Sequence, residues 1–270
     1  MLAEHGEAPK DYPVSFVIGS NNKLELEKTE KGYLVNGSVV NVPWARHTKE
    51  ILVLCSVEGE SIITLLPLNK ANIHQNRNLA GEPMDKVVFD DINVENVMTL
   101  VVEEPKLLEE VMNLGGLSKA AMMSGAMDRI LELSIQYAKE REQFGRPLHR
   151  LQAIQQHLAV LSGETVAVLA STNQAIEAYD QGIVTDEIAN AKLKANQATE
   201  IVTEIAHQVH GAIGTTHEHR LHQLTRRLWA WREEFGNENV WAEKLAYQVM
   251  NSEKLSLWEM ITDKSETKVV

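Results

Sequence analysis

The sequence changes character near residue 102. Before this point, short apolar stretches alternate with turn-forming residues, which is typical of β-strands and hairpins. After it, glycine and proline become sparse and alanine, leucine, glutamate and glutamine dominate, as they do in long helices. We therefore predict an α+β chain, with a β domain over 1–102, a helical bundle over 103–262 and a tail over 263–270.

The first half is typical of six to eight short strands, which predicts a small β-barrel or sandwich. Asn36-Gly37 lies between two apolar stretches and is the strongest short hairpin signal. A second hairpin is predicted for 51–55 and 62–66, which flank Glu58-Gly59-Glu60. A further strand is predicted over Lys86–Asp90.

The second half is typical of long helices with short connections, which form an antiparallel bundle. Thr185 followed by two acids indicates a helix N-cap, and the stretch 211–216 contains glycines and predicts a loop. The predicted helices cover about 105–141, 148–179 and 185–210, then a segment that ends at Gly236, and finally about 238–260.

Charge and composition exclude several kinds of partner and compartment. The formal net charge of −12 argues against broad binding to nucleic acid or anionic membranes, because phosphate contacts need clustered lysine and arginine. No run approaches the roughly 18 apolar residues of a membrane span. The single Cys55 excludes a disulfide scaffold and a cysteine zinc site. The start Met1–His5 lacks the features of a signal peptide, so a cytoplasmic protein is expected.

The first candidate site is the stretch Arg141–Pro147, between two predicted helices. Arg141 and Phe144 are three residues apart and are predicted to share a helical face. A guanidinium beside an aromatic ring suits a phosphate that carries a stacked ring. The alternative is a plain helix end, with Gly145 as the cap and Pro147 starting the next helix.

The second candidate is Gln208–Thr215, where two glycines would let a ligand approach the backbone. The alternative is an ordinary helix end and turn. The third is a group of five histidines between 207 and 222. It holds one Glu204-x-x-His207 unit, whereas a di-iron bundle needs two, so we expect no metal site and keep a metal-binding bundle as a remote alternative.

Together, these motifs and their order resemble the acyl-CoA dehydrogenase family of flavoproteins over nearly the whole chain. The resemblance implies the family's β middle domain and helical C-terminal domain, FAD bound at a subunit interface in a dimer or tetramer, and α,β-dehydrogenation of an acyl-CoA thioester. Electrons would pass to an electron-transferring flavoprotein. The motifs are Gly32–Gly37, Tyr137–Pro147, Leu151–Gln155, Gln208–Gly214, His219–His222 and Arg226-Arg227.

The resemblance also implies which residues hold FAD. One group grips the pyrophosphate and adenosine end across the interface, a second lies along the ADP moiety, and a third meets the pyrophosphate of a neighbouring subunit's cofactor. Ala212 stands where the family usually has a second glycine. The first group is Arg141 and Phe144, the second is Gln143, Leu148 and Gln152, and the third is Gln208, Gly211 and Ala212.

The chain departs from the family where the catalytic base is expected. One family position precedes Gly236 and holds Phe235, which cannot accept a proton. The other falls near Gly115-Gly116, which offers no carboxylate. We take Glu234 as the candidate base, with Glu233 and Glu238 as further candidates. The alternative is that these are solvated acids at a helix end.

Two more departures favour a partner-dependent role. The family normally begins with a helical domain of about one hundred residues, and this chain is expected to start inside the β domain. Asn41-Val42-Pro43-Trp44 replaces the flavin-facing Trp-x-Thr pattern, and Pro43 has no amide hydrogen to donate. The alternative function is thus a non-catalytic subunit of a heteromer with a helical partner chain, contributing an interface and part of the FAD site.

Overall fold

A computed structural model of the protein describes residues 10–17, 23–57, 60–95, 99–182 and 186–251. The predictions for the N-terminus, the N-cap Thr185, the end of the last helix and the tail lie outside these residues. Contacts divide the chain into two compact units, Met1–Glu109 and Glu110–Val270, and each is described by itself. Among the helices of the described part, none has the length and apolarity needed to cross a membrane.

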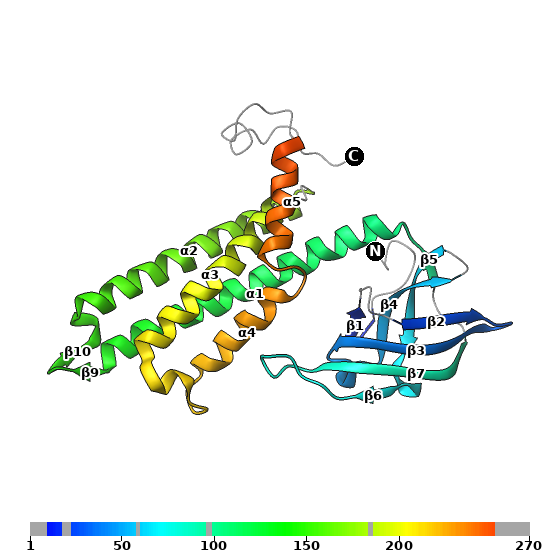
Figure 1. The fold of residues 1–270 in the computed structure, drawn as a ribbon, viewed down its shortest axis with the longest axis horizontal. Helices are drawn as coiled ribbons and strands as arrows, with labels where there is room; N and C mark the ends of the chain where they lie inside the picture. Colours follow the sequence, from blue (N-terminus) through cyan, green and yellow to red (C-terminus); the bar gives the residue numbers. More distant parts are fainter. Residues whose placement is uncertain (1–9, 18–22, 58–59, 96–98, 183–185, 252–270) are drawn as a thin grey trace. The chain divides into compact units, whose positions relative to one another are not determined.

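The first unit contains two four-stranded sheets (Figure 1). The strand order is β1-β4-β5-β8 in one sheet and β2-β3-β7-β6 in the other. Every pairing is antiparallel except that of β1 with β4. The strands are β1 (Val14–Val17), β2 (Lys23–Lys28), β3 (Gly32–Pro43), β4 (Glu50–Val57), β5 (Glu60–Pro67), β6 (Asn72–His74), β7 (Met84–Glu95) and β8 (Thr99–Val101).

Both sheets contribute to one apolar core. Val39 and Phe89 come from the second sheet, and Val53 and Leu66 from the first, and all four are buried in one cluster. Burying one face of each sheet in this way is the arrangement of a sandwich. Of the two predicted architectures, the described residues therefore form the sandwich and not a closed barrel.

The hairpin predicted at Asn36-Gly37 is wrong. Strand β3 runs straight through these residues, and its register with β7 shifts between Val35 and Gly37. Gly37 has a φ of 116°, and the Asn36 side chain donates a hydrogen bond of 2.8 Å to Asp91 Oδ1. The Asn-Gly pair therefore lies in a β-bulge, where glycine is favoured as it is in a hairpin turn. The hairpin predicted for 51–55 and 62–66 is confirmed as β4 and β5.

The second unit is a helical bundle, and the prediction of an α+β chain is confirmed. Helix α2 starts later than predicted, because a short hairpin and a 3-10 turn, η4 (Leu148–Arg150), come first. The predicted loop at 211–216 is largely a 3-10 helix, η5 (Gly211–Thr215). The helices are α1 (Glu104–Glu140), α2 (Gln152–Asp180), α3 (Asp186–His210), α4 (Leu221–Glu233) and α5 (Glu238–Asn251).

Helices α1 to α4 share the core of this unit. Met127 of α1, Leu161 of α2, Val202 of α3 and Leu228 of α4 are buried in the same cluster. Several of the buried α3 residues are alanines, whose small side chains let neighbouring helices approach closely. This packing fixes the helix ends, and the two candidate cofactor segments follow the ends of α1 and α3.

Candidate functional site

The first candidate segment forms a hairpin of two short strands, β9 (Glu142–Gln143) and β10 (Arg146–Pro147). Its two turn residues, Phe144 and Gly145, have φ values of 55° and 73°. Two consecutive positive φ values match the twist of a tight hairpin. Helix α1 has already ended at Glu140.

Three expectations for this segment are therefore wrong. Arg141 and Phe144 do not share a helical face, because the chain turns between them. Gly145 is not a helix cap, and Pro147 lies in β10 and does not start the next helix. The hairpin places Phe144 at its tip with 86% of the residue exposed.

The exposed side chains of this hairpin are suited to binding. Within the described residues, the guanidinium of Arg141 makes no hydrogen bond or ion pair, and Gln143 is exposed beside it. A left-handed backbone costs a residue other than glycine about 1–2 kcal/mol. A strained, exposed aromatic residue beside an unpaired cation indicates a surface for a ligand or a partner.

Leu148 anchors the hairpin to the bundle. Its side chain is buried with Ala138 and Val209, and its N–H donates to the carbonyl of Arg141 over 2.8 Å. A cofactor contact by Leu148 would therefore use its main chain. Gln152, the first residue of α2, is exposed.

The second candidate segment follows α3. Gln208, Gly211 and Ala212 are all exposed. Gly211 has a φ of 62°, and a Cβ atom built on it would meet nothing within 4 Å. By contrast, a Cβ on Gly214 would lie 2.9 Å from Leu221 Cδ2, so this glycine is needed for packing. The segment thus offers an open backbone at Gly211 and a rigid support behind it.

His210 connects the two segments. It is only 3% exposed, and its Nδ1 lies 2.8 Å from the carbonyl oxygen of Ala206. Its ring stacks on Tyr137 of α1 with centroids 4.7 Å apart, and the ring of His219 lies 4.9 Å away. The ends of α1 and α3 therefore lie at the same end of the bundle (Figure 1).

The histidines do not form a metal centre in the described part of the chain, where no three His, Cys, Asp or Glu side chains are placed to hold a metal ion. His210 is a core residue, whereas His217 is exposed. His207 Nε2 lies 3.0 Å from the Thr225 hydroxyl oxygen. Burial lowers the pKa of both His207 and His210.

The two positions expected for a catalytic base meet in space. Phe235 has a φ of 54°, and its ring lies directly over Gly115 of α1. A Cβ atom on Gly115 would be 2.1–2.4 Å from three ring atoms of Phe235. The indole of Trp241 covers Gly116 in the same way, and its Nε1 donates to the carbonyl of Phe235 over 3.0 Å. The phenyl ring of Phe235 therefore fills the position where the family resemblance implies a catalytic carboxylate.

The nearby carboxylates are paired or exposed. Glu234 forms an ion pair of 2.7 Å with Lys119. Glu238 accepts a hydrogen bond of 2.9 Å from Arg232, which lowers the pKa of Glu238. Glu233 is exposed. Two of the three carboxylates are thus held by cations, and the third faces solvent.

Sequence reasoning missed Lys192, which is fully buried in α3. Its ammonium donates to Asn196 Oδ1 (2.6 Å) and to the carbonyls of Trp231 (3.2 Å), Arg232 (3.0 Å) and Gly236 (3.1 Å). Burial lowers its pKa to about 7, although nearby acids oppose the shift. Lys192 thus holds the turn that carries Phe235.

A signal for Lys192 was present in the sequence. Ile188, Lys192, Ala195 and Thr199 recur at helical spacing, so the lysine lies on the otherwise apolar face of α3. All four are buried. A lysine in such a helix is normally assumed to be solvated, because lysine is almost never fully buried unless its charge is satisfied.

Comparison with known sequence families now adds to this geometry. The C-terminal domain of acyl-CoA dehydrogenases matches residues 106–250. The chain belongs to the acyl-CoA dehydrogenase family. The family resemblance seen in the sequence is therefore confirmed.

Individual relatives agree with this assignment. The chain is 30% identical over 151 residues to acryloyl-CoA reductase (NADH) of Anaerotignum propionicum, covering 55% of this chain and 38% of that protein. It is 35% identical over 108 residues to the acyl-CoA dehydrogenase IpdE2 of Mycobacterium tuberculosis, covering 40% of this chain and 33% of that protein. The chain thus spans less than two fifths of either relative.

Solved structures support the fold. The ChsE4–ChsE5 complex from Mycobacterium tuberculosis contains a chain that matches with a TM-score of 0.79 and 18% identity. The match covers 90% of this chain and 68% of that chain. At this identity the likeness shows the fold alone.

Proposed function

We propose that this chain is a subunit of an FAD-dependent acyl-CoA dehydrogenase and that it contributes an interface and part of the FAD site, while another chain supplies the base. The observation that carries this role is the ring of Phe235 on Gly115, at the place where the family's base is expected. Family membership supports the reaction class. A cytoplasmic location and electron transfer to an electron-transferring flavoprotein belong to the same proposal.

The residues at the end of the bundle fit FAD. A pyrophosphate needs positive charge and room to approach the backbone closely, which Arg141 and the open space at Gly211 offer. An adenine or flavin ring needs a flat apolar surface, which the exposed Phe144 offers. Gln143 and Gln208 add exposed amide groups. When bound, FAD supplies the hydride acceptor of the reaction.

The chemistry demands a base that this chain does not offer in a suitable state. Oxidation of an acyl-CoA removes a proton from the α-carbon and a hydride from the β-carbon, so a carboxylate must accept the proton. Phe235 cannot do this, and Glu234 is held in an ion pair with Lys119. The proposed role therefore leaves proton abstraction to a carboxylate of another chain.

The assembly is part of the proposal. The ChsE4–ChsE5 structure is a complex that includes a chain of this fold. A heteromer with a helical partner chain fits the departure at Phe235. A homodimer or homotetramer remains the arrangement expected if the chain is active by itself.

The second candidate function is an active dehydrogenase that uses Glu234. Its support is that Glu234 directly precedes Phe235 and that only 19% of its side chain is exposed. Replacing Glu234 with glutamine distinguishes the two. Turnover of the assembled enzyme that survives the change eliminates Glu234 as the base, whereas its loss would favour the active chain.

Removal of Arg141 tests the cofactor site. Arg141→Ala should lower the FAD content of the purified assembly, because a charge-assisted hydrogen bond of about 1.5–3 kcal/mol is lost and binding weakens roughly ten- to hundredfold. Flavin absorbance per protein measures this. The matched control is Arg129→Ala, which removes an exposed arginine from α1. Equal flavin content in the two variants would refute the assigned site.

A further inference from the structure

The ring of His210 lies between the two segments assigned to FAD. On one side it stacks on Tyr137, which is one helical turn before Arg141. His210 also directly precedes Gly211 in the chain. Its Cβ atom would lie 3.0 Å from a Cβ atom built on Gly214. The ring thus packs where the helices that precede the two segments end.

The hydrogen bonds of His210 favour the uncharged ring. Its Nδ1 donates to the carbonyl of Ala206, so the neutral ring carries no hydrogen on Nε2. Nε2 is buried and has no hydrogen-bond partner among the described residues. Protonation would place a new N–H and a positive charge where no acceptor is available.

The groups around His210 do not stabilise a positive charge. Tyr137 of α1, His207 one turn earlier in α3, and His219 beyond η5 face it, and none is negatively charged at neutral pH. Burial lowers its pKa first, and His219 and His207 lower it further, while the bond to Ala206 opposes them. As the pH falls toward this lowered pKa, the folded junction is therefore destabilised relative to the open one.

We propose that His210 is a positioning residue for FAD, whose uncharged ring ties the β9–β10 hairpin to η5. This inference rests on the proposed FAD site. It implies that acid pH loosens the junction and releases the cofactor, although His210 itself need not touch FAD.

Two substitutions distinguish the effect of ring stacking at His210 from the effect of ring protonation. His210→Ala removes the ring and should weaken FAD binding to the purified assembly roughly threefold to tenfold at neutral pH, the range expected for a lost aromatic pair. His210→Phe keeps a stacking ring without a titratable nitrogen. It should retain FAD at neutral pH and lose less FAD than the unmodified protein at acid pH. His217→Ala, at an exposed histidine outside the stack, is the control.

NMR of the histidine ring protons gives a second readout that does not depend on activity. Between about pH 8 and pH 5, the ring of His210 should titrate below the ordinary histidine pKa of about 6.5, and the ring signals of Tyr137 should shift with it. Titration of His210 at or above a pKa of about 6.5 would overturn the requirement for an uncharged ring.

The outcomes distinguish this inference from the proposed function. If the unmodified assembly carries no FAD at any pH, both fail. If the assembly carries FAD and His210→Ala binds it as tightly as the His217→Ala control, only the positioning role fails. Weaker binding in His210→Ala with retention in His210→Phe supports both.

Discussion

At the scale of single residues, two phenylalanines carry most of the functional account. Phe144 and Phe235 both have a left-handed backbone, with φ values of 55° and 54°. Such strain persists only where the surroundings enforce it, and it gathers at functional positions. Phe144 sits on a solvent-exposed turn, whereas Phe235 packs on Gly115. We interpret the first as a binding surface and the second as a filled base position.

Relieving the strain at Phe144 should separate stability from binding. Phe144→Asn should raise the free energy of unfolding by about 1 kcal/mol, because asparagine tolerates a left-handed backbone and Asn-Gly is the preferred pair in such turns. The same change should lower the FAD content of the assembly, since the aromatic surface is gone. Denaturant unfolding and flavin absorbance measure the two effects. A variant that is no more stable, or that keeps its FAD, would contradict this view of the hairpin.

Sequence reasoning went only part of the way for individual residues. The Arg141–Pro147 motif was readable because its residue types and order are distinctive. The role of Leu148 could not be predicted, because burial depends on which neighbour a residue meets. For Lys192, helical spacing indicated its place on a buried face but not its partners. The hydrogen bonds of Lys192 reach carbonyls about forty residues away, which no local pattern shows.

At the scale of elements, two glycines of α1 let the helix pack closely against the turn between α4 and α5 and the start of α5. A side chain at Gly115 would collide with the Phe235 ring, and one at Gly116 with Trp241. The pair of glycines in an otherwise regular helix is thus explained by close packing, despite the cost of glycine in helices.

Gly115→Ala should destabilise the protein by about 1–3 kcal/mol, because the rigid ring of Phe235 must move. In a Phe235→Ala background the same change should cost far less. Gly125→Ala, on the same helix with open space around it, is the control and should stabilise by about 0.5–1 kcal/mol. Thermal or denaturant unfolding of the four proteins of the double-mutant cycle measures the coupling. An equal cost in both backgrounds would show that Phe235 does not occupy this space in solution.

Helices with long stretches of helical spacing were predicted well from the sequence. Elements whose ends depend on short turns were predicted poorly. The five helices follow from extended helical spacing, and their ends differ from the predictions mainly next to short turns. Asn36-Gly37 failed because pairing with β7 turns a hairpin signal into a bulge. The turn at Phe144-Gly145 was missed because phenylalanine is not expected at a positive φ.

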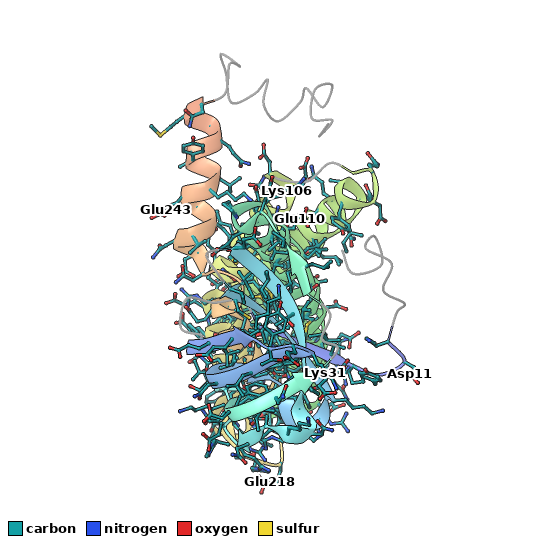
Figure 2. All side chains as sticks on the ribbon, turned by 90° about the vertical axis from the view of Figure 1, so that its right-hand side faces the viewer. Asp11, Lys31, Lys106, Glu110, Glu218 and Glu243 are labelled. Carbon is teal, nitrogen blue, oxygen red and sulfur yellow. The ribbon has the colours of Figure 1, made fainter. Side chains whose placement is uncertain are left out.

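At the scale of the whole molecule, charge makes local groups decisive. The chain carries a net charge of −12, and FAD and acyl-CoA are anionic. Acids such as Glu218 and Glu243 of the helical unit are exposed, and their side chains point outward from the ribbon (Figure 2). Overall attraction would therefore not hold the proposed ligands, so the proposed site depends on unpaired cations such as Arg141. This makes the contribution of a neighbouring subunit central to the account.

An experimental structure of the FAD-loaded assembly, purified with its partner chains, tests this account most directly. The measured quantity is the distance of each carboxylate, and of the Arg141–Phe144 hairpin, from the bound cofactor. We predict that Arg141 and Phe144 contact FAD and that the carboxylate nearest to the reactive flavin nitrogen belongs to another chain. A hairpin directed into solvent, or Glu234 facing the flavin, would contradict the account.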